Sequence, residues 1–370
     1  MNDINRLARL HDAGVSIWLD SLSRELLETG ELGRLIREDF VSGATSNPTI
    51  FAKALVGTER YAPQLANAVR AGLDDPREAF FTLALEDVRR AARELRDAHD
   101  AASGNDGFVS FECTPDVADD TDDTIAQALA LWHRLDEPNV MIKVPATAAG
   151  VPAIEELTAR GVNVNVTLLF SVDRYEEVMR AYVRGLERRA EADRPIDAIR
   201  SVASFFVSRV DSKADAVLPS GHPARGRVAV ANASIAYARY RERFAGGRWE
   251  ALRARGAAPQ RPLWASTGTK NPEYSDVLYV ERLVAPDVVN TMPLQTLRAF
   301  ADHGEVGEPL TADATDAERV LAAAADAGLD LTRVTAELER EGVQAFCDSY
   351  ELILRAMEQE LAAARERALT

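Results

Sequence analysis

The chain has 370 residues, 46% of them hydrophobic and 6% aromatic, so it can bury a sizeable aliphatic core. Its 43 basic and 59 acidic residues give a net charge of −16, which argues against general binding to nucleic acids or to anionic membranes. Two cysteines are too few for a disulfide framework, and no apolar segment approaches transmembrane length, so we expect a cytoplasmic protein.

Eight short segments rich in β-forming residues recur along the chain, and we predict them as strands. They occupy residues 15–21, 41–47, 108–114, 140–145, 162–170, 201–208, 262–269 and 288–292. Apolar residues at helical spacing lie between them; one such helix should begin in the Asp- and Thr-rich segment 119–124. Strands that alternate with helices imply a parallel sheet.

The number of strands favours a closed barrel over an open sheet, and no Gly-x-Gly-x-x-Gly motif of a dinucleotide-binding sheet follows the first strand. Long helical connectors span residues 58–103 and 209–256, and two more helices are expected near 313–328 and 331–368. No repeat or linker divides the chain. We therefore predict an α/β fold, a (β/α)8 TIM barrel with additional N-terminal, inserted and C-terminal helices, as a single domain over residues 1–370.

Polar side chains lie at or near the carboxyl ends of six of these strands, the end that carries catalysis in this architecture. Strands of a parallel barrel are otherwise almost continuously apolar. The six strands carry Asp20, Asn47, Glu112, Lys143, Asn165 with Thr167, and Ser204. Their position predicts a catalytic site at this end of the barrel.

The alternation of side chains along a strand groups some of these residues. Residues two apart should share a face on the fifth, sixth and seventh strands: Asn165 with Thr167, Ser204 with Phe206, and Ser266 with Gly268 and Lys270. Cys113 adjoins Glu112 and should point to the other side, as a small buried apolar side chain.

Lys143 is the charged residue that most needs an explanation. It lies between Ile142 and Val144 in the apolar segment VMIKVP, where an unpaired charge is costly to bury. A lone lysine at a strand end usually extends to solvent. With Asp20 and Glu112 on nearby strands, we instead predict a nucleophile. Apolar surroundings favour the neutral amine that attacks a carbonyl, whereas the carboxylates favour its charged form.

Two interpretations of the carboxylates are possible. Asp20 and Glu112 could be structural charge partners of Lys143, or they could transfer protons during Schiff-base chemistry, and we favour the second interpretation. The uncharged polar residues would then bind substrate hydroxyls or a catalytic water; these are Asn47, Asn165, Thr167 and Ser204. Any one of them alone would be an ordinary buried polar group.

Taken in order, these segments resemble the transaldolase family from about residue 10 to about residue 360. The resemblance rests on SIWLDS, ATSNPTIF, SFECTPD, VMIKVPAT, NVNVTLLFS, SVASFFVSRVD and LWASTGTKNP. SNPTIF, IKVPAT and NVTLLFS are each fairly specific, and their order makes the match much more specific. The chain length and the WASTGTKNP segment are similar to a longer bacterial branch of the family.

The resemblance implies a Schiff-base mechanism without metal or cofactor, in the non-oxidative pentose phosphate pathway. Lys143 would attack the ketose carbonyl of fructose 6-phosphate or sedoheptulose 7-phosphate. Asp20 would take the C4 hydroxyl proton as the C3–C4 bond breaks, and Glu112 with Thr167 would orient the catalytic water. The dihydroxyacetone unit left on the lysine would pass to erythrose 4-phosphate or glyceraldehyde 3-phosphate.

The resemblance also implies how substrates are held. Asn47 and Asn165 would bind hydroxyl groups of the intermediate. Phosphate binding in the family uses an arginine after the sixth strand, matched by Arg209, and a Ser-x-Arg element on the seventh. Here Ser266 is followed four residues later by Lys270 and by no arginine. Lys270 could replace the missing arginine, with a single point charge in place of the two parallel donors of a guanidinium, or it could be an ordinary exposed loop lysine.

Two alternatives stay open. A fructose-6-phosphate aldolase-like enzyme would release free dihydroxyacetone. In that sister group, the position that matches Glu112 resembles a glutamine and the position that matches Phe206 a tyrosine, so this chain fits it less well. A non-catalytic barrel could bind sugar phosphates as a sensor. None of the five histidines lies on a predicted strand, which disfavours a metal-dependent aldolase. We expect sugar phosphates as partners, no nucleic acid or membrane, and a monomer or homodimer.

Overall fold

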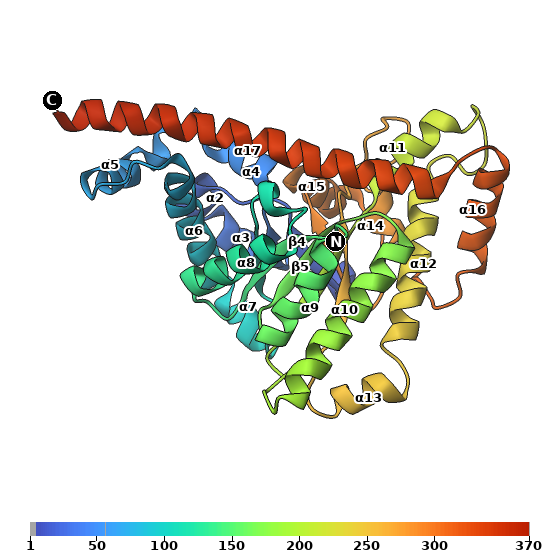
Figure 1. The fold of residues 1–370 in the computed structure, drawn as a ribbon. Helices are drawn as coiled ribbons and strands as arrows, with labels where there is room; N and C mark the ends of the chain where they lie inside the picture. Colours follow the sequence, from blue (N-terminus) through green and yellow to red (C-terminus); the bar gives the residue numbers. More distant parts are fainter. Residues whose placement is uncertain (1–4, 56, 370) are drawn as a thin grey trace.

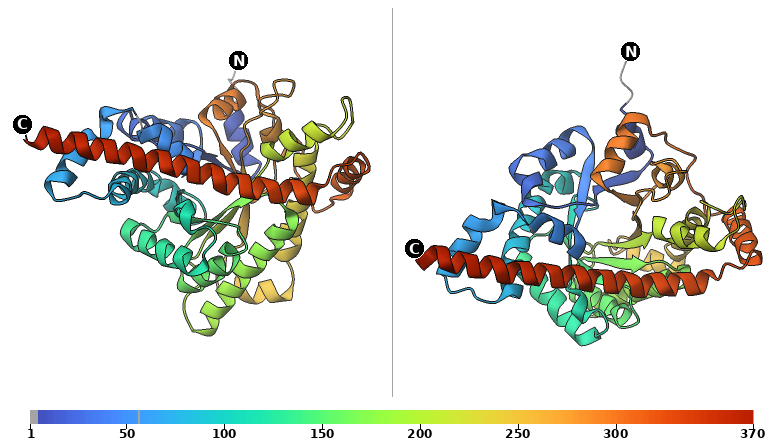
Figure 2. Two further views of the ribbon diagram at one scale, coloured as in Figure 1. Left: turned by 45° about the horizontal axis from the view of Figure 1, so that its top comes forward. Right: turned by 90° about the horizontal axis from the view of Figure 1, so that it is seen from above.

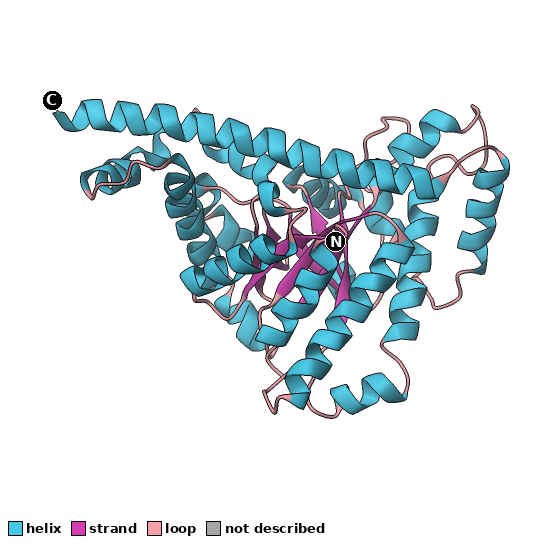
Figure 3. Ribbon diagram, in the orientation of Figure 1, coloured by secondary structure: helices cyan, strands magenta, loops and turns pink. Residues whose placement is uncertain are grey.

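The predicted strands form the centre of the molecule in the computed structural model, which describes residues 5–55 and 57–369. They are parallel and paired in sequence order, and the eighth pairs with the first, so the barrel is closed. Figure 3 shows the strands in magenta, enclosed by helices. The strands are β1 (Val15–Leu19), β2 (Val41–Thr45), β3 (Phe108–Glu112), β4 (Val140–Pro145), β5 (Val164–Leu169), β6 (Ser201–Phe206), β7 (Gln260–Ala265) and β8 (Val288–Met292). The predicted (β/α)8 barrel is confirmed.

Most of the strand predictions extend too far at the carboxyl end, where the chain leaves the sheet to build the site. The largest error concerns the segment 262–269, because β7 ends at Ala265. Ser266 has a left-handed backbone with φ +56°, which a strand cannot accommodate. The prediction that Ser266, Gly268 and Lys270 alternate on one strand face is therefore wrong, and these residues belong to a loop.

Helices surround the barrel and also precede and follow it, as predicted (Figure 1). They are α1 (Arg6–Asp12), α2 (Arg24–Glu28), α3 (Glu31–Glu38), α4 (Pro48–Leu55), α5 (Ala62–Arg70), α6 (Pro76–Glu94), α7 (Arg96–Ala101), α8 (Thr121–Leu135), α9 (Gly150–Arg160), α10 (Val172–Glu191), α11 (Ser208–Val217), α12 (Val228–Arg243), α13 (Gly247–Arg253), α14 (Leu278–Arg282), α15 (Leu294–His303), α16 (Thr315–Asp326) and α17 (Leu331–Leu369), with short 3-10 turns η1 (Glu59–Tyr61) and η2 (Pro115–Val117). The Asp- and Thr-rich segment begins α8, where the Asp120 carboxylate accepts a hydrogen bond from the Asp123 amide at 2.9 Å.

Apolar side chains of the strands and most helices form one main cluster, and a smaller cluster lies where α13 packs near α10. Within the described ranges 5–55 and 57–369, no helix combines the length and apolar character needed to span a membrane.

The long helix α17 covers the end of the barrel that holds the site. It crosses the molecule from side to side in both views of Figure 2 and packs against α4, α5, α6 and α11. Gly342 marks its close approach to the sheet, because a Cβ there would lie 2.8 Å from Leu168 Cδ2 at the end of β5. Phe346, one turn further on, is buried. A segment more than 150 residues after β5 in sequence therefore forms part of the catalytic end.

Candidate active site

The registers of β3, β4 and β5 place three predicted site residues at one level. Glu112 pairs with Lys143, and Lys143 pairs with Asn165. Paired residues of neighbouring parallel strands point to the same side of the sheet. Lys143 Nζ lies 3.2 Å from Glu112 Oε2, and only 5% and 4% of the two side chains are exposed. The barrel therefore brings the predicted lysine and carboxylate into a buried ion pair.

Glu112 remains short of hydrogen bonds in this pair. Lys143 Nζ also donates to the Ser46 carbonyl at 2.8 Å. Neither Glu112 oxygen accepts a hydrogen bond of good geometry from the described part of the chain, and the same holds for Thr167 Oγ1. Burial raises the pKa of Glu112, the charge of Lys143 opposes this, and the negative charge of Asp20 adds to it. Glu112 and Thr167 thus have polar atoms available to a substrate or a water molecule.

Asp20 follows β1 and is held on two sides. Its amide donates to the Met292 carbonyl at 2.7 Å, and its carboxylate accepts from Thr45 Oγ1 at 2.8 Å. Thr45 Oγ1 also lies 2.8 Å from Thr291 Oγ1. Enclosure by protein raises the pKa of Asp20, although Lys143 and the Thr45 hydrogen bond lower it. A carboxyl group with a raised pKa is suited to accepting and returning a proton.

A pocket of about 240 Å³ opens between these strand ends. Nine of the eleven predicted site residues line it: Asp20, Asn47, Lys143, Thr167, Ser204, Phe206, Arg209, Ser266 and Lys270. Glu112 and Asn165 do not line it but support residues that do. Asn165 is fully buried, donating to Ser110 Oγ at 2.9 Å and accepting from Ser204 Oγ at 2.7 Å. Ser204 and Phe206 share the pocket face, in agreement with the predicted alternation on β6.

Several residues that line the same pocket were not among the predicted site residues, for example Thr45, Lys53, Thr291 and Phe346. Thr45 had a visible signal, since it stands two residues before Asn47 in the ATSNPTIF segment. Phe346 lies on the apolar face of the C-terminal helix, and the spacing of that face predicts docking on the barrel, but it does not show that the ring reaches the pocket.

Arg209 and Lys270 are two of the cationic residues that line the pocket. Arg209 is the second residue of α11, and its guanidinium lies 5.3 Å from the centroid of the Phe206 ring. Among the residues that the structure describes, no carboxylate or other acceptor binds it by an ion pair or hydrogen bond. Lys270 lines the pocket from the exposed loop after β7. Ser266, the first residue of that loop, is 3.0 Å from Ser208, measured between the two hydroxyl oxygens.

A closed parallel barrel with a buried lysine–carboxylate pair, a second carboxyl group and basic residues at its carboxyl end has the arrangement of a (β/α)8-barrel enzyme.

Comparison with known proteins identifies the family. The sequence model of the transaldolase/fructose-6-phosphate aldolase family matches residues 17–357. Transaldolases of Acidothermus cellulolyticus and Saccharopolyspora erythraea are 50% and 49% identical over 364 and 367 residues, which cover 97% and 98% of this chain and 98% and 99% of theirs. The transaldolase of Frankia alni is 48% identical over 363 residues, 96% of this chain and 98% of its own. The chain belongs to the transaldolase/fructose-6-phosphate aldolase family.

Proposed function

We propose that this chain is a transaldolase that carries a dihydroxyacetone unit between sugar phosphates as a Schiff base on Lys143. The observation that carries the proposal is the placement of Lys143. Its amine is buried beside Glu112, yet it lines a pocket that also holds Asp20, Arg209 and Lys270. The names of the relatives, which cover nearly all of this chain at about half identity, support transfer as the reaction.

In the first step, the neutral Lys143 amine attacks the carbonyl carbon C2 of fructose 6-phosphate or sedoheptulose 7-phosphate. The resulting carbinolamine loses its hydroxyl as water to give the imine, so one proton must reach the leaving oxygen. Glu112 and Thr167 are proposed to hold this water and to move the proton. Support comes from their polar atoms, which lack hydrogen-bond partners among the described residues.

In the second step, Asp20 takes the C4 hydroxyl proton as the C3–C4 bond breaks. The electron pair of that bond moves into the protonated imine and gives an enamine on Lys143, while the C4 aldehyde leaves as an aldose phosphate. Attack of the enamine carbon on the aldehyde of an acceptor, with Asp20 returning the proton to the new alkoxide, forms the C3–C4 bond of a new ketose that is still bound to Lys143 as an imine. Addition of water at C2 then breaks the carbon–nitrogen bond, which releases the ketose and the free Lys143 amine. Asn47, Asn165 and Ser204 are proposed to position hydroxyl groups, either directly or through the Asn165–Ser204 hydrogen bond.

The phosphate group is proposed to bind beside Arg209 and Lys270 in the pocket. Arg209 suits this role because its guanidinium has no ionic partner among the described residues and can offer two parallel donors. Lys270 would contribute a second positive charge, with Ser266 beside it. Local cations are needed because the whole chain carries a net charge of −16, which disfavours anionic substrates at long range.

Release of free dihydroxyacetone is the reaction that the enzyme must suppress. Phe206 lines the pocket and packs against Phe170, with ring centroids 5.1 Å apart. An apolar ring offers no hydroxyl to position water or donate a proton to the enamine. Fructose 6-phosphate alone should therefore yield little dihydroxyacetone, whereas adding erythrose 4-phosphate should yield sedoheptulose 7-phosphate rapidly. Equal rates with and without the acceptor would identify an aldolase.

Borohydride trapping tests the nucleophile. Reduction in the presence of fructose 6-phosphate should add a dihydroxyacetone-derived mass to the peptide that contains Lys143. Lys143→Ala should keep its fold and lose the adduct. Lys213→Ala is a matched control, because Lys213 lies outside the pocket in ion pairs with Glu337 and Glu341, and it should retain the adduct. An adduct on a different lysine would refute the proposed site.

We further propose that residues 1–370 fold as one domain and act in the cytoplasm as a monomer or homodimer. Support comes from the single main apolar cluster, which joins the strands to α17, and from the two unpaired cysteines. One cooperative unfolding transition is expected, and two separate transitions would contradict the single domain.

A further inference from the structure

The loop that carries Lys270 needs an anchor that fixes it relative to Arg209. This loop, residues 266–277, joins β7 to α14, and most of its middle is exposed. Local turns shape it: Thr269 Oγ1 donates to the Ser275 carbonyl at 2.8 Å, and Asn271 Oδ1 accepts from the Glu273 amide at 3.0 Å. These two hydrogen bonds are both within the loop, so they do not determine its distance from α11.

Two side chains of the loop reach α11: Ser266 contacts Ser208 at the start of the helix, and Tyr274 contacts Asp215 near its end. Tyr274 OH donates to Asp215 Oδ2 at 2.7 Å. The other oxygen, Asp215 Oδ1, accepts from the Gly226 amide at 3.0 Å, in the segment that follows α11. Gly226 has φ +66°, and a Cβ there would lie 2.7 Å from Tyr274 Cζ, so the ring packs directly on this glycine. Tyr274 therefore joins the loop to α11 by both packing and a hydrogen bond to a carboxylate.

Arg209 and Asp215 belong to the same helix, α11 (Ser208–Val217). A second tyrosine ties the next element to that helix, since Tyr279 OH of α14 donates to Asp211 Oδ2 at 2.9 Å. Because α11 is a rigid unit, a contact at Asp215 fixes the loop relative to Arg209. The phenol is a donor at neutral pH, and burial together with the Asp215 carboxylate raises the pKa of Tyr274 further, to about 12.

We propose that the Tyr274–Asp215 pair is a positioning device that holds Lys270 facing the same phosphate as Arg209. Neither Tyr274 nor Asp215 lines the pocket, so neither touches substrate. The family's Ser-x-Arg element would place its arginine two residues after the serine, whereas Lys270 follows Ser266 by four residues in a loop. A longer loop has more conformations to lose, and the tyrosine anchor limits them before the substrate binds. This inference rests on the proposed phosphate site.

A double-mutant cycle on the full chain tests it, with Tyr274→Phe, Lys270→Ala and the double variant. The readouts are KM for fructose 6-phosphate, kcat, and the inhibition constant for inorganic phosphate. Tyr274→Phe should raise both KM and the phosphate inhibition constant roughly three- to ten-fold, the effect of one lost hydrogen bond, with kcat within about two-fold. In the Lys270→Ala background, the same change should have no further effect.

Tyr182→Phe is the matched control. It also removes a phenol hydroxyl from a hydrogen bond, to the Ala258 carbonyl at 2.8 Å, but in the smaller apolar cluster away from the pocket. Its KM and inhibition constant should stay unchanged, and thermal unfolding should show all variants folded.

The outcomes separate this inference from the proposed function. If Lys270→Ala weakens phosphate binding and Tyr274→Phe does not, the positioning role is wrong and the phosphate site stands. Additive effects in the double variant would mean that Tyr274 acts independently of Lys270, which also overturns the inference. If Lys270→Ala changes neither constant while Arg209→Ala does, Lys270 is no phosphate ligand and both statements about it fail.

Discussion

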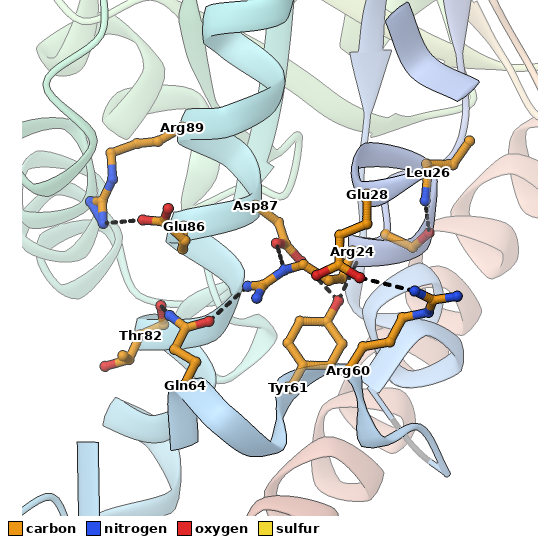
Figure 4. Close-up of polar contacts among 11 residues, drawn as sticks. Arg24, Leu26, Glu28, Arg60, Tyr61, Gln64, Thr82, Glu86, Asp87 and Arg89 are labelled. Carbon is orange, nitrogen blue, oxygen red and sulfur yellow. Dashed lines mark hydrogen bonds and ion pairs between the residues drawn. The ribbon is translucent and has the colours of Figure 1, made fainter. Parts of the chain in front are cut away.

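Two buried ion pairs of this molecule are alike in burial and different in their hydrogen bonding. The first joins Arg24 of α2 to Asp87 of α6, with 7% and 0% of the side chains exposed (Figure 4). Arg24 Nε binds one Asp87 oxygen, and Tyr61 OH donates to the other at 2.8 Å. Arg24 Nη2 donates to Gln64 Oε1 at 2.7 Å, and Gln64 in turn donates to the Thr82 carbonyl at 3.0 Å.

The second pair, Lys143 with Glu112, is just as deeply buried, but neither Glu112 oxygen accepts a well-aligned hydrogen bond within the described ranges. An ion pair whose carboxylate oxygens are both engaged holds elements together and has little capacity left for a ligand. The second pair keeps unused acceptors on Glu112 beside Lys143, which lines the pocket, so it retains capacity for a ligand. This difference in hydrogen bonding supports a structural role for the first pair and the proposed catalytic role for the second.

Matched amide substitutions give the largest expected difference between the two pairs. Glu112→Gln should lower kcat by roughly two to four orders of magnitude, because it removes one acid/base group, and the protein should remain folded. Asp87→Asn should leave kcat of the folded enzyme near normal and lower the free energy of unfolding by about 3–5 kcal/mol, because Arg24 loses its charge partner. Steady-state kinetics and urea unfolding measure both effects. If Glu112→Gln were to reduce only stability, the assignment of Glu112 to catalysis would fail.

The two arginines Arg24 and Arg209 extend the comparison to ligand binding, with a smaller expected effect. Arg209→Ala should raise KM for phosphorylated substrates roughly ten- to hundred-fold, as expected for a charge-assisted contact of about 1.5–3 kcal/mol, and should change KM for unphosphorylated analogues much less. Arg24→Met should mainly lower stability. If Arg209→Ala raised KM equally for phosphorylated and unphosphorylated substrates, Arg209 would be a structural residue like Arg24.

The pH profile gives the smallest expected effect. The pKa of Asp20 is raised above its usual 3.8, chiefly by burial, so kcat/KM should fall on the acid side at a pH above that value as the base becomes protonated. A raised folded-state pKa also means that this group's stability contribution is lost as pH rises from 3.8 through the folded value. Asp20→Asn should therefore flatten the unfolding free energy over that window. Asp87→Asn serves as the kinetic control, and it should leave the pH at which kcat/KM falls on the acid side unchanged.

The sequence was sufficient for the architecture because strand and helix periodicities are local. The segments 140–145 and 288–292 coincide with β4 and β8, and the Asp- and Thr-rich segment begins α8. Polar residues at strand ends also identified part of the pocket, because a buried charge such as that of Lys143 in an apolar strand is costly unless it is paired or used. Strand ends were predicted less well, since a left-handed residue such as Ser266 leaves no reliable trace in composition.

Only the tertiary structure decided which polar residues meet and which are already satisfied. Strand register joined Glu112 to Lys143 and buried Asn165 behind Ser204, while the long helix α17 brought Phe346 to a pocket built from strands far earlier in the chain. The anchoring of the Lys270 loop by Tyr274 depends on a contact between residues 59 positions apart. Local sequence patterns record the period of each helix or strand. These contacts instead depend on how the helices pack against the closed barrel, and that packing is a property of the whole chain.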